Sequence, residues 1–267
     1  MKSLTEGNTY RNLLEFAFPI LLGNLLQLTY NAADSIIVGK CAGEDALAAV
    51  GISNPIMSII ILGASGLSIG ASAFMGNAYG AEKLEEVRKA FASVVFVGAI
   101  LSIIILGVSL NGYHLFMGIF QVPDKIYLLT EFYLKIILFS FPFTFLYNII
   151  TAALRSIGDS RTPIVFLGIS CMLNVILDLV FVGEFQMSVA GAGLSTLIAE
   201  SFSCILCILH VYKNVPLLAL KKEEWKPDKR IMVIILKNGG VTALQQLMQP
   251  IGKVLIQGCV NLYGVSM

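Results

Sequence analysis

Three acidic residues lie inside long apolar stretches of the sequence: Asp34, Asp178 and Glu200. An unpaired charge in the middle of a membrane costs at least ~3 kcal/mol, so ionisable residues at such positions usually serve a function. Asp34 follows Leu13 by 21 residues, which places it ~30 Å along a helix. Asp178 follows Pro163 by 15 residues and lies ~22 Å along another helix of the same direction. The two acids are therefore expected at comparable depths.

Polar side chains recur around the first acid. Asn24, Gln27, Asn31 and Asp34 follow one another at steps of three, four and three residues, which predicts a polar stripe along one face of a helix. We expect this stripe to face the interior of a helix bundle. Pro19 lies inside the same apolar stretch, where it removes one backbone hydrogen bond and can bend the helix.

Two further stretches bring more oxygen atoms to the same depth. Asn174 lies one helical turn before Asp178, and Ala192 lies one turn before Thr196 on the next stretch, which returns from the opposite side. Together with Asp34, these residues can converge from three helices. Two carboxylates, an amide, a hydroxyl and a backbone carbonyl would form a cage suited to a hard cation, such as Na⁺ held by Asp34, Asn174, Asp178 and Thr196.

The same residues allow two other interpretations. Two close carboxylates in a medium of low dielectric cannot both ionise cheaply, so the pair could bind protons instead of a metal ion. Alternatively, these polar groups could satisfy one another and only hold the helices together. Glu200, one turn beyond Thr196, could extend a proton path or make a packing hydrogen bond. Glu131 and Lys135 are one turn apart and are predicted to form a surface ion pair.

The elements that position these residues are membrane-spanning helices. The 267 residues are 57% hydrophobic and 13% charged, with a mean hydropathy of +0.82, which favours lipid over water as the solvent. Charged residues cluster between apolar runs of about 20 residues or more. These runs predict an all-α, polytopic transmembrane bundle with seven spans, at 13–39, 46–78, 90–111, 126–154, 163–183, 188–212 and 231 to the end.

Basic residues are distributed unequally between the two sides of these spans. Fourteen lysines and arginines fall on the side of the N-terminus and three, Lys40, Lys125 and Lys135, on the other. This bias predicts a cytoplasmic N-terminus. The basic cluster at 221–230 is then a membrane-side anchor, and no nucleic-acid partner is expected.

The seventh span resembles the first at an offset of 222 residues. Asn24, Gln27 and Asn31 then correspond to Gln246, Gln249 and Lys253, which indicates a duplicated bundle whose halves run in parallel. We therefore predict a six-helix N-terminal lobe at 1–212, a cytoplasmic linker between the lobes at 213–230, and the incomplete first helix of a second lobe at 231–267.

Four segments of the sequence resemble the multidrug and toxic-compound extrusion (MATE) transporters. They are FPILLGNLLQLTYNAADSIIVG (Phe18 to Gly39), ALAAVGISNP (Ala46 to Pro55), LRSIGDSRTP (Leu154 to Pro163) and NVILD (Asn174 to Asp178). The third also has a local reading, in which Gly158 ends one helix and Thr162, as N-cap before Pro163, starts the next.

The resemblance implies an antiporter in the cell membrane, with twelve helices in two lobes, that exports amphipathic or cationic organic compounds in exchange for H⁺ or Na⁺. It needs no other cofactor, catalyses no chemical reaction, and requires the missing C-terminal lobe. The family's cation site then corresponds to Asp34, Asn174, Asp178 and Thr196, with the carbonyl of Ala192, and Pro19 corresponds to a proline at which the first helix bends. Residues assigned to the lining of the cavity are Asn24, Gln27, Asn31, Asn148, Thr151 and Glu200.

Other functions are open at this stage. A lipid-linked oligosaccharide flippase shares the architecture, but would favour arginines at mid-membrane, and none is placed there. An intramembrane aspartyl protease would need YD and GxGD motifs in its helices, which are absent. An ATP-driven pump would need a phosphate-binding loop, whereas Gly39 and Lys40 precede Cys41. An inactive truncated fragment is the remaining alternative.

Overall fold

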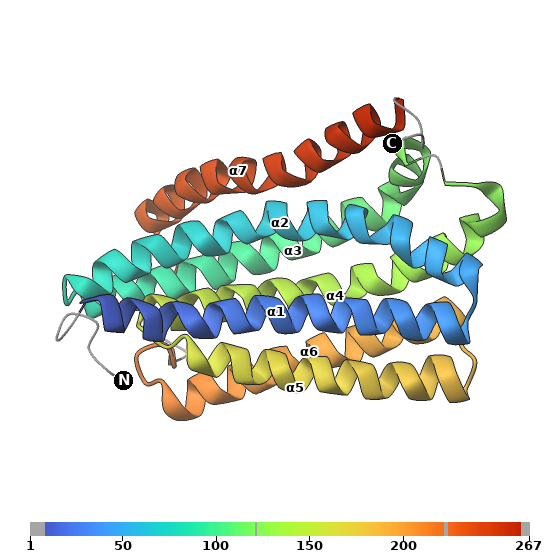
Figure 1. Ribbon diagram of the computed structural model, residues 1–267. Helices are drawn as coiled ribbons and strands as arrows, with labels where there is room; N and C mark the ends of the chain where they lie inside the picture. The colour runs from blue at the N-terminus through green and yellow to red at the C-terminus, as the bar shows by residue number, and fades with distance from the viewer. Residues whose placement is uncertain (1–8, 121, 222–223, 263–267) are drawn as a thin grey trace.

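A computed structural model describes residues 9–120, 122–221 and 224–262, which form a bundle of long helices (Figure 1). These residues contain seven α-helices and no β-strand. A short π-helix, η1 (Leu179–Glu184), continues the fifth helix. The helices are α1 (Thr9–Cys41), α2 (Glu44–Gly80), α3 (Leu84–Ile119), α4 (Asp124–Ser156), α5 (Arg161–Asp178), α6 (Ser188–Asn214) and α7 (Lys229–Leu262). The predicted all-α class is confirmed.

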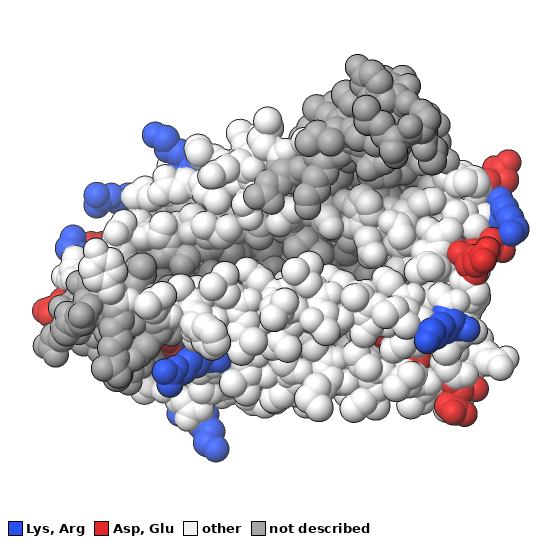
Figure 2. Space-filling model, in the orientation of Figure 1, with Lys and Arg blue, Asp and Glu red and all other residues white. Residues whose placement is uncertain are grey.

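The bundle has the dimensions and surface of a multi-pass membrane protein. Six of its described helices are long and apolar enough to cross a membrane, namely α2, α3, α4, α5 with η1, α6 and α7 up to Met248. Helix α1 has 33 residues, and several side chains near its start, at 11–13, 15 and 16, lie outside the described part of the chain in which these six spans were identified. Charged side chains gather towards the two ends of the molecule, and its middle is covered mainly by uncharged residues (Figure 2).

Helices extend beyond the predicted apolar spans. The third helix contains the span at 90–111 but begins at Leu84 and ends at Ile119. Glu85 and Glu86 in its first turn favour the earlier start. The stretch at 163–183 continues as a π-helix to Glu184.

The predicted cap at Thr162 is wrong. The α5 helix already begins at Arg161, and Asp159 Oδ1 accepts a hydrogen bond from the Thr162 N–H at 3.0 Å. A carboxylate three residues upstream therefore satisfies a free N–H group of the first turn. Gly158 has a φ of 92° directly after α4, as expected of a glycine that ends a helix.

Helix α4 lies at the centre of the bundle, packed against α2, α3 and α6. Its buried side chains contribute to two apolar clusters. One contains Phe141 and Phe145 with residues of α2, α3 and the segment before α7, and the other contains Tyr133 and Leu134 with residues of α1 and α2. By contrast, α1 packs mainly on α5 and exposes many of its leucines. The first helix is therefore attached to the lobe along one side.

Helix α7 packs closely on α2, as the small residues of α2 predict (Figure 1). A Cβ atom on Gly66 would overlap the backbone of Ala243, and one on Gly70 would lie 2.5 Å from the backbone nitrogen of Gly239. A Cβ on Gly239 would in turn lie 2.9 Å from the Cα of Leu67. Glycine is therefore required for this contact. Of the residues that suggested an internal repeat, Gln249 and Lys253 have side chains outside the described part of the chain.

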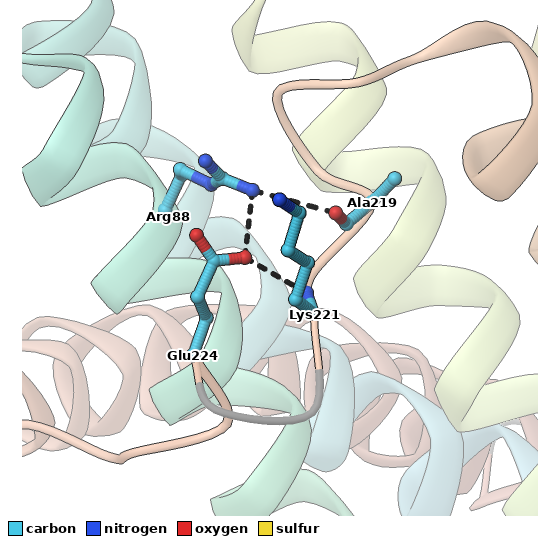
Figure 3. A network of polar contacts seen from close by, with 4 residues as sticks. All are labelled: Arg88, Ala219, Lys221 and Glu224. Atoms are coloured by element: carbon cyan, nitrogen blue, oxygen red, sulfur yellow. Dashed lines mark hydrogen bonds and ion pairs between the residues drawn. The ribbon is translucent and has the colours of Figure 1, made fainter.

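The segment between α6 and α7 is docked on the beginning of α3 (Figure 3). Arg88 of α3 donates to Glu224 Oε2 at 2.8 Å and to the carbonyl of Ala219 at 3.4 Å. The same Glu224 oxygen accepts the Lys221 N–H at 2.8 Å. Nearby, Leu218 and Leu220 are buried in the apolar core. The linker therefore fixes the position at which α7 begins.

Candidate functional site

Asp178 is the last residue of α5 and has no exposed surface. The π-helix starts directly after it, and such irregular turns occur frequently at functional sites. The Ser195 hydroxyl on α6 lies within hydrogen-bonding distance of both Asp178 Oδ1 and the carbonyl of Ala192. A hydroxyl has one hydrogen, so Ser195 can donate to only one of these acceptors at a time. When Ser195 donates to Asp178, it does not donate to the Ala192 carbonyl, which is then more available to bind another group.

Asn174, Thr196 and Ala192 lie beside Asp178, as predicted. Thr196 donates from Oγ1 to the Ala192 carbonyl at 3.0 Å, and the Asn174 amide lies 3.3 Å from Thr196 Oγ1. With the amide turned so that its nitrogen faces Asp178, Asn174 donates to Asp178 Oδ2 and accepts from the Thr196 N–H, each at 3.3 Å. We prefer this orientation, because it gives both amide atoms a partner. Asn174 therefore connects the acid on its own helix to α6.

Asp34 brings the second carboxylate from α1. Its side chain is 8% exposed, and its Oδ1 atom is buried without a hydrogen-bond partner among the described residues. The Asp34 and Asp178 carboxyl groups lie close enough to share a hydrogen bond, which requires a proton on one of them. Tyr133 of α4 is buried and interacts electrostatically with both acids.

Among the described residues, these carboxylates have no compensating cation. None of the ion pairs among the described residues involves Asp34, Asp178 or Glu200. The described residues also contain no group of three or more histidine, cysteine, aspartate and glutamate side chains that could hold a metal ion. The oxygen atoms of Asp34, Asp178, Asn174, Thr196 and Ala192 are instead the mixed set that a proton or a hard monovalent cation could use.

A cavity of about 280 Å³ lies next to this cluster. Asn174 and Thr196 line it and so form a wall shared with the acids. Of the residues predicted to line the cavity, Gln27, Asn148 and Glu200 do so. Asn24, Asn31 and Thr151 are not among its lining residues, and Thr151 is instead buried and donates to the Asn148 carbonyl at 3.1 Å.

The prediction that the whole polar stripe of α1 faces inward is corrected. Asp34 is buried, and Gln27, although exposed, lines the cavity, whereas Asn24 and Asn31 are exposed and do not line it. At about 100° per residue, Gln27 lies only about 20° from Asp34 around the helix, but Asn31 lies about 60° and Asn24 about 80° away. Because α1 packs mainly along α5, only the narrower face of Gln27 and Asp34 turns inward. Helix α1 continues through Pro19.

Three residues near the acids were missed by reasoning from the sequence. Ser195 lies outside the predicted spacing, since it precedes Thr196 by one position and is therefore about 100° away from it around α6. Tyr30 lines the cavity. It precedes Asp34 by four residues, and this helical spacing is a signal in the sequence that Tyr30 lies on the same face of α1. Tyr133 lies on α4, and its proximity could not have been found without the packing of α4 against the other helices.

The sequence matches the family model named MatE over residues 19–180, which is more than half of the chain. Among curated proteins, it is 30% identical over 265 residues to "Probable multidrug resistance protein YpnP" of Bacillus subtilis (strain 168), covering 97% of this chain and 58% of that protein. It is 24% identical over 234 residues to "Multidrug export protein MepA" of Staphylococcus aureus (strain NCTC 8325 / PS 47), covering 88% of this chain and 52% of that protein. The chain thus spans about half the length of these relatives.

Solved structures share the fold. "Crystal structure of MATE in the straight conformation" aligns with a TM-score of 0.89 at 24% identity, covering 97% of this chain and 58% of that one. "Outward-facing conformation of a multidrug resistance MATE family transporter of the MOP superfamily" aligns with a TM-score of 0.82 at 24% identity, covering 90% of this chain and 53% of that one. The helices of this chain are therefore arranged like those in the aligned part of each structure, which is 58% of the first chain and 53% of the second.

Proposed function

The chain belongs to the MatE family, and from this premise we propose that it supplies one lobe, and the first helix of a second, of a secondary antiporter. The antiporter exports amphipathic or cationic organic compounds in exchange for H⁺ or Na⁺. The names of its relatives, a probable multidrug resistance protein and a multidrug export protein, support this class of substrate. Because the chain spans about half of each relative, the second lobe is part of the proposal.

The observation that carries this proposal is the pair of buried acids on α1 and α5. Asp34 and Asp178 approach each other without a lysine or arginine partner among the described residues, and one Asp34 oxygen has no hydrogen-bond partner. A buried carboxylate without a partner is costly. Binding of a cation or a proton removes this cost, so the pair is suited to bind and release a coupling ion.

The donor set fits either coupling ion. For Na⁺, the carboxylates of Asp34 and Asp178 would be joined by neutral oxygens from Asn174, Thr196 and Ala192. For H⁺, the two carboxyl groups would share one proton, with Ser195 as the hydrogen-bond donor to Asp178. An ion drives transport only if it binds one arrangement of the two lobes more tightly than the other.

Helix α1 can link ion binding to such a change of arrangement. It carries Asp34 but packs mainly on α5, with exposed residues along much of its length. Pro19 lies within it, at a position where a helix bends at low cost because one backbone hydrogen bond is already missing. Neutralising Asp34 and Asp178 therefore changes the contact that these two acids make between α1 and α5.

The test is export of a fluorescent organic cation from proteoliposomes that contain the full product of the reading frame. Proton and sodium gradients are imposed separately, and Asp34→Asn is compared with Glu131→Gln, which makes the same chemical change at an acid paired with Lys135. We expect one gradient to drive export, Asp34→Asn to fall to the level of empty liposomes, and Glu131→Gln to resemble the unmodified protein. Gradient-driven export by Asp34→Asn at the normal rate would contradict the proposed site.

The proposed setting is the cell membrane, with the N-terminus in the cytoplasm, because lysines and arginines are concentrated on that side of the spans. Cys41 then lies on the outer side, where it is exposed between α1 and α2. In a Cys259→Ser background, an impermeant maleimide should label Cys41 in intact cells, since Cys171, Cys204 and Cys207 are buried. Labelling only after the cells are opened would reverse the assigned orientation.

A further inference from the structure

The acidic side chains of the linker between α6 and α7, residues 215–228, are used inside the protein. Glu224 accepts hydrogen bonds from the Arg88 side chain and from the Lys221 N–H, each at 2.8 Å (Figure 3). Asp228 Oδ1 accepts from two N–H groups in the first turn of α7, at 2.8 and 3.3 Å. The third acid of the linker, Glu223, lies outside the described residues. Both described acids therefore have partners within the chain.

The basic side chains of the same region lack such partners. None of the ion pairs among the described residues involves the five exposed basic residues in and beside the linker, which are Lys213, Lys221, Lys226, Lys229 and Arg230. By contrast, Lys83 and Lys89 near the start of α3 are paired with Glu86 and Glu85, at 3.4 and 3.6 Å. The described part of the linker therefore presents positive charge to its surroundings, although acids and bases alternate in its sequence.

The linker runs along the first turns of α3. Glu224 contacts Arg88, which lies about 6 Å along α3 from its first residue. The Asp228 N–H donates to Ser93 Oγ at 3.0 Å, and Ser93 lies about 14 Å along the same helix. Lys89 is the last charged residue of α3 and marks the level at which its apolar, membrane-spanning part begins. The linker therefore crosses the boundary between the lipid headgroups and the hydrocarbon.

Trp225 lies between these two contacts in the sequence and is 40% exposed. The indole ring is apolar but carries an N–H donor, so tryptophan is enriched where the membrane meets water. Lys226 follows directly, and the stem of a lysine can lie on apolar surface while its ammonium group reaches the headgroups. The linker itself is anchored, because Leu218 and Leu220 are buried in the apolar core. An aromatic ring and an unpaired cation are thus held together at the membrane boundary.

We propose that this linker is a binding surface for anionic phospholipids, with Trp225 at the hydrocarbon boundary and Lys226, Lys229 and Arg230 on the headgroup phosphates. Basic segments directly outside a membrane helix attract anionic lipids, and each lysine or arginine near such a surface strengthens binding roughly fivefold. The lipid fixes the segment between α6 and α7 to the membrane surface. This inference does not rest on the proposed transport function, since it uses neither the coupling acids nor the cavity.

The experiment measures the fluorescence of Trp225 in the full product of the reading frame, reconstituted in phosphatidylcholine liposomes. The signal of Trp225 is the difference from a Trp225→Phe sample. Part of the lipid is replaced by a brominated lipid, which quenches tryptophan on contact, either as phosphatidylglycerol or as phosphatidylcholine with bromine at the same place in the acyl chain. We expect phosphatidylglycerol to quench Trp225 at a lower mole fraction. This preference should disappear in about 1 M salt, where the Debye length is about 3 Å.

Two double variants separate free charges from paired ones. Lys226→Gln with Lys229→Gln removes two unpaired cations, and Lys83→Gln with Lys89→Gln removes two cations that already have acidic partners at the same end of α3. The first should lower the relative affinity for phosphatidylglycerol about 10- to 25-fold, and the second should leave it nearly unchanged.

Equal quenching by the two lipids in the unmodified protein would overturn the proposal, as would a full preference for phosphatidylglycerol in Lys226→Gln with Lys229→Gln. An equal loss of preference in both double variants would also overturn it, because the lipid would then respond to the overall charge of this end of the protein. None of these outcomes depends on gradient-driven export, so the lipid surface and the antiporter can fail separately.

Discussion

Glu131 and Asp178 are both carboxylates in membrane helices, but their surroundings are opposite. Glu131 accepts from Lys135 at 2.6 Å and from the Tyr113 hydroxyl at 2.7 Å, and the Lys135 ammonium lies 4.6 Å from the centre of the Tyr113 ring. Asp178 has Ser195, Asn174 and a second acid, Asp34, as neighbours. Glu131 is neutralised by a lysine of the protein itself, whereas Asp178 depends on a proton or a cation from solution.

This difference separates polar residues that stabilise the fold from those that form a site. A carboxylate with its own cation is satisfied in every state of the protein, so it cannot respond to an ion gradient. A buried carboxylate without a cation lowers stability and changes its state when an ion binds. The cluster of Arg88, Glu224 and Lys221 belongs to the first kind, because opposite charges meet directly at 2.8 Å (Figure 3).

The largest expected effect concerns the unpaired acids. Asp178→Asn should lower gradient-driven export by at least about 100-fold, comparable to the loss of a key catalytic or coupling group. The melting temperature of the purified protein should stay the same or rise, because an amide is cheaper to bury than an uncompensated carboxylate. Export assays and thermal unfolding of the same sample measure both effects. A large fall in melting temperature would instead assign Asp178 a structural role.

An intermediate effect is expected where the paired cluster is turned into an unpaired one. Lys135→Met leaves Glu131 without its cation and should lower the melting temperature slightly, since both side chains retain some exposure to solvent. Adding Glu131→Gln should restore most of this stability, because no charge is then left unpaired. Thermal unfolding of the single and double variants gives the comparison. If the double variant is the least stable of the set, charge pairing is not what holds this cluster.

The smallest effect is expected at the linker. Arg88 and Glu224 have side chains that are 31% and 35% exposed, so their coupling should be about 0.5–1 kcal/mol in a double-mutant cycle with alanine. Gradient-driven export should persist in both single variants. A coupling near zero would show that the buried Leu218 and Leu220, rather than this ion pair, hold the linker on α3.

The sequence was sufficient to predict the helices and most of the acid cluster, because both depend on short-range spacing. Asn174 and Asp178 are four residues apart on α5 and share a face of that helix regardless of how the other helices pack. The prediction that the polar stripe of α1 faces inward was wrong for Asn24 and Asn31, because the face that turns inward depends on how α1 contacts α5. Ser195, Tyr133 and the cavity beside Glu200 arise from the approach of α4 and α6, and the π-helix after Asp178 has no clear sequence signal.

The close contact between α2 and α7 also has a consequence for biosynthesis. Gly66 is about 180 residues upstream of the segment of α7 that covers it. At a translation rate of about 5–20 residues per second, the surface of α2 around Gly66 and Gly70 is made on the order of 10–40 s before the part of α7 that covers it. During that interval it faces lipid or the insertion machinery, and its shape would accept another small-residue helix equally well. After the first six helices are made, this small-residue surface of α2 is therefore exposed and able to bind another helix until α7 is synthesised and covers it.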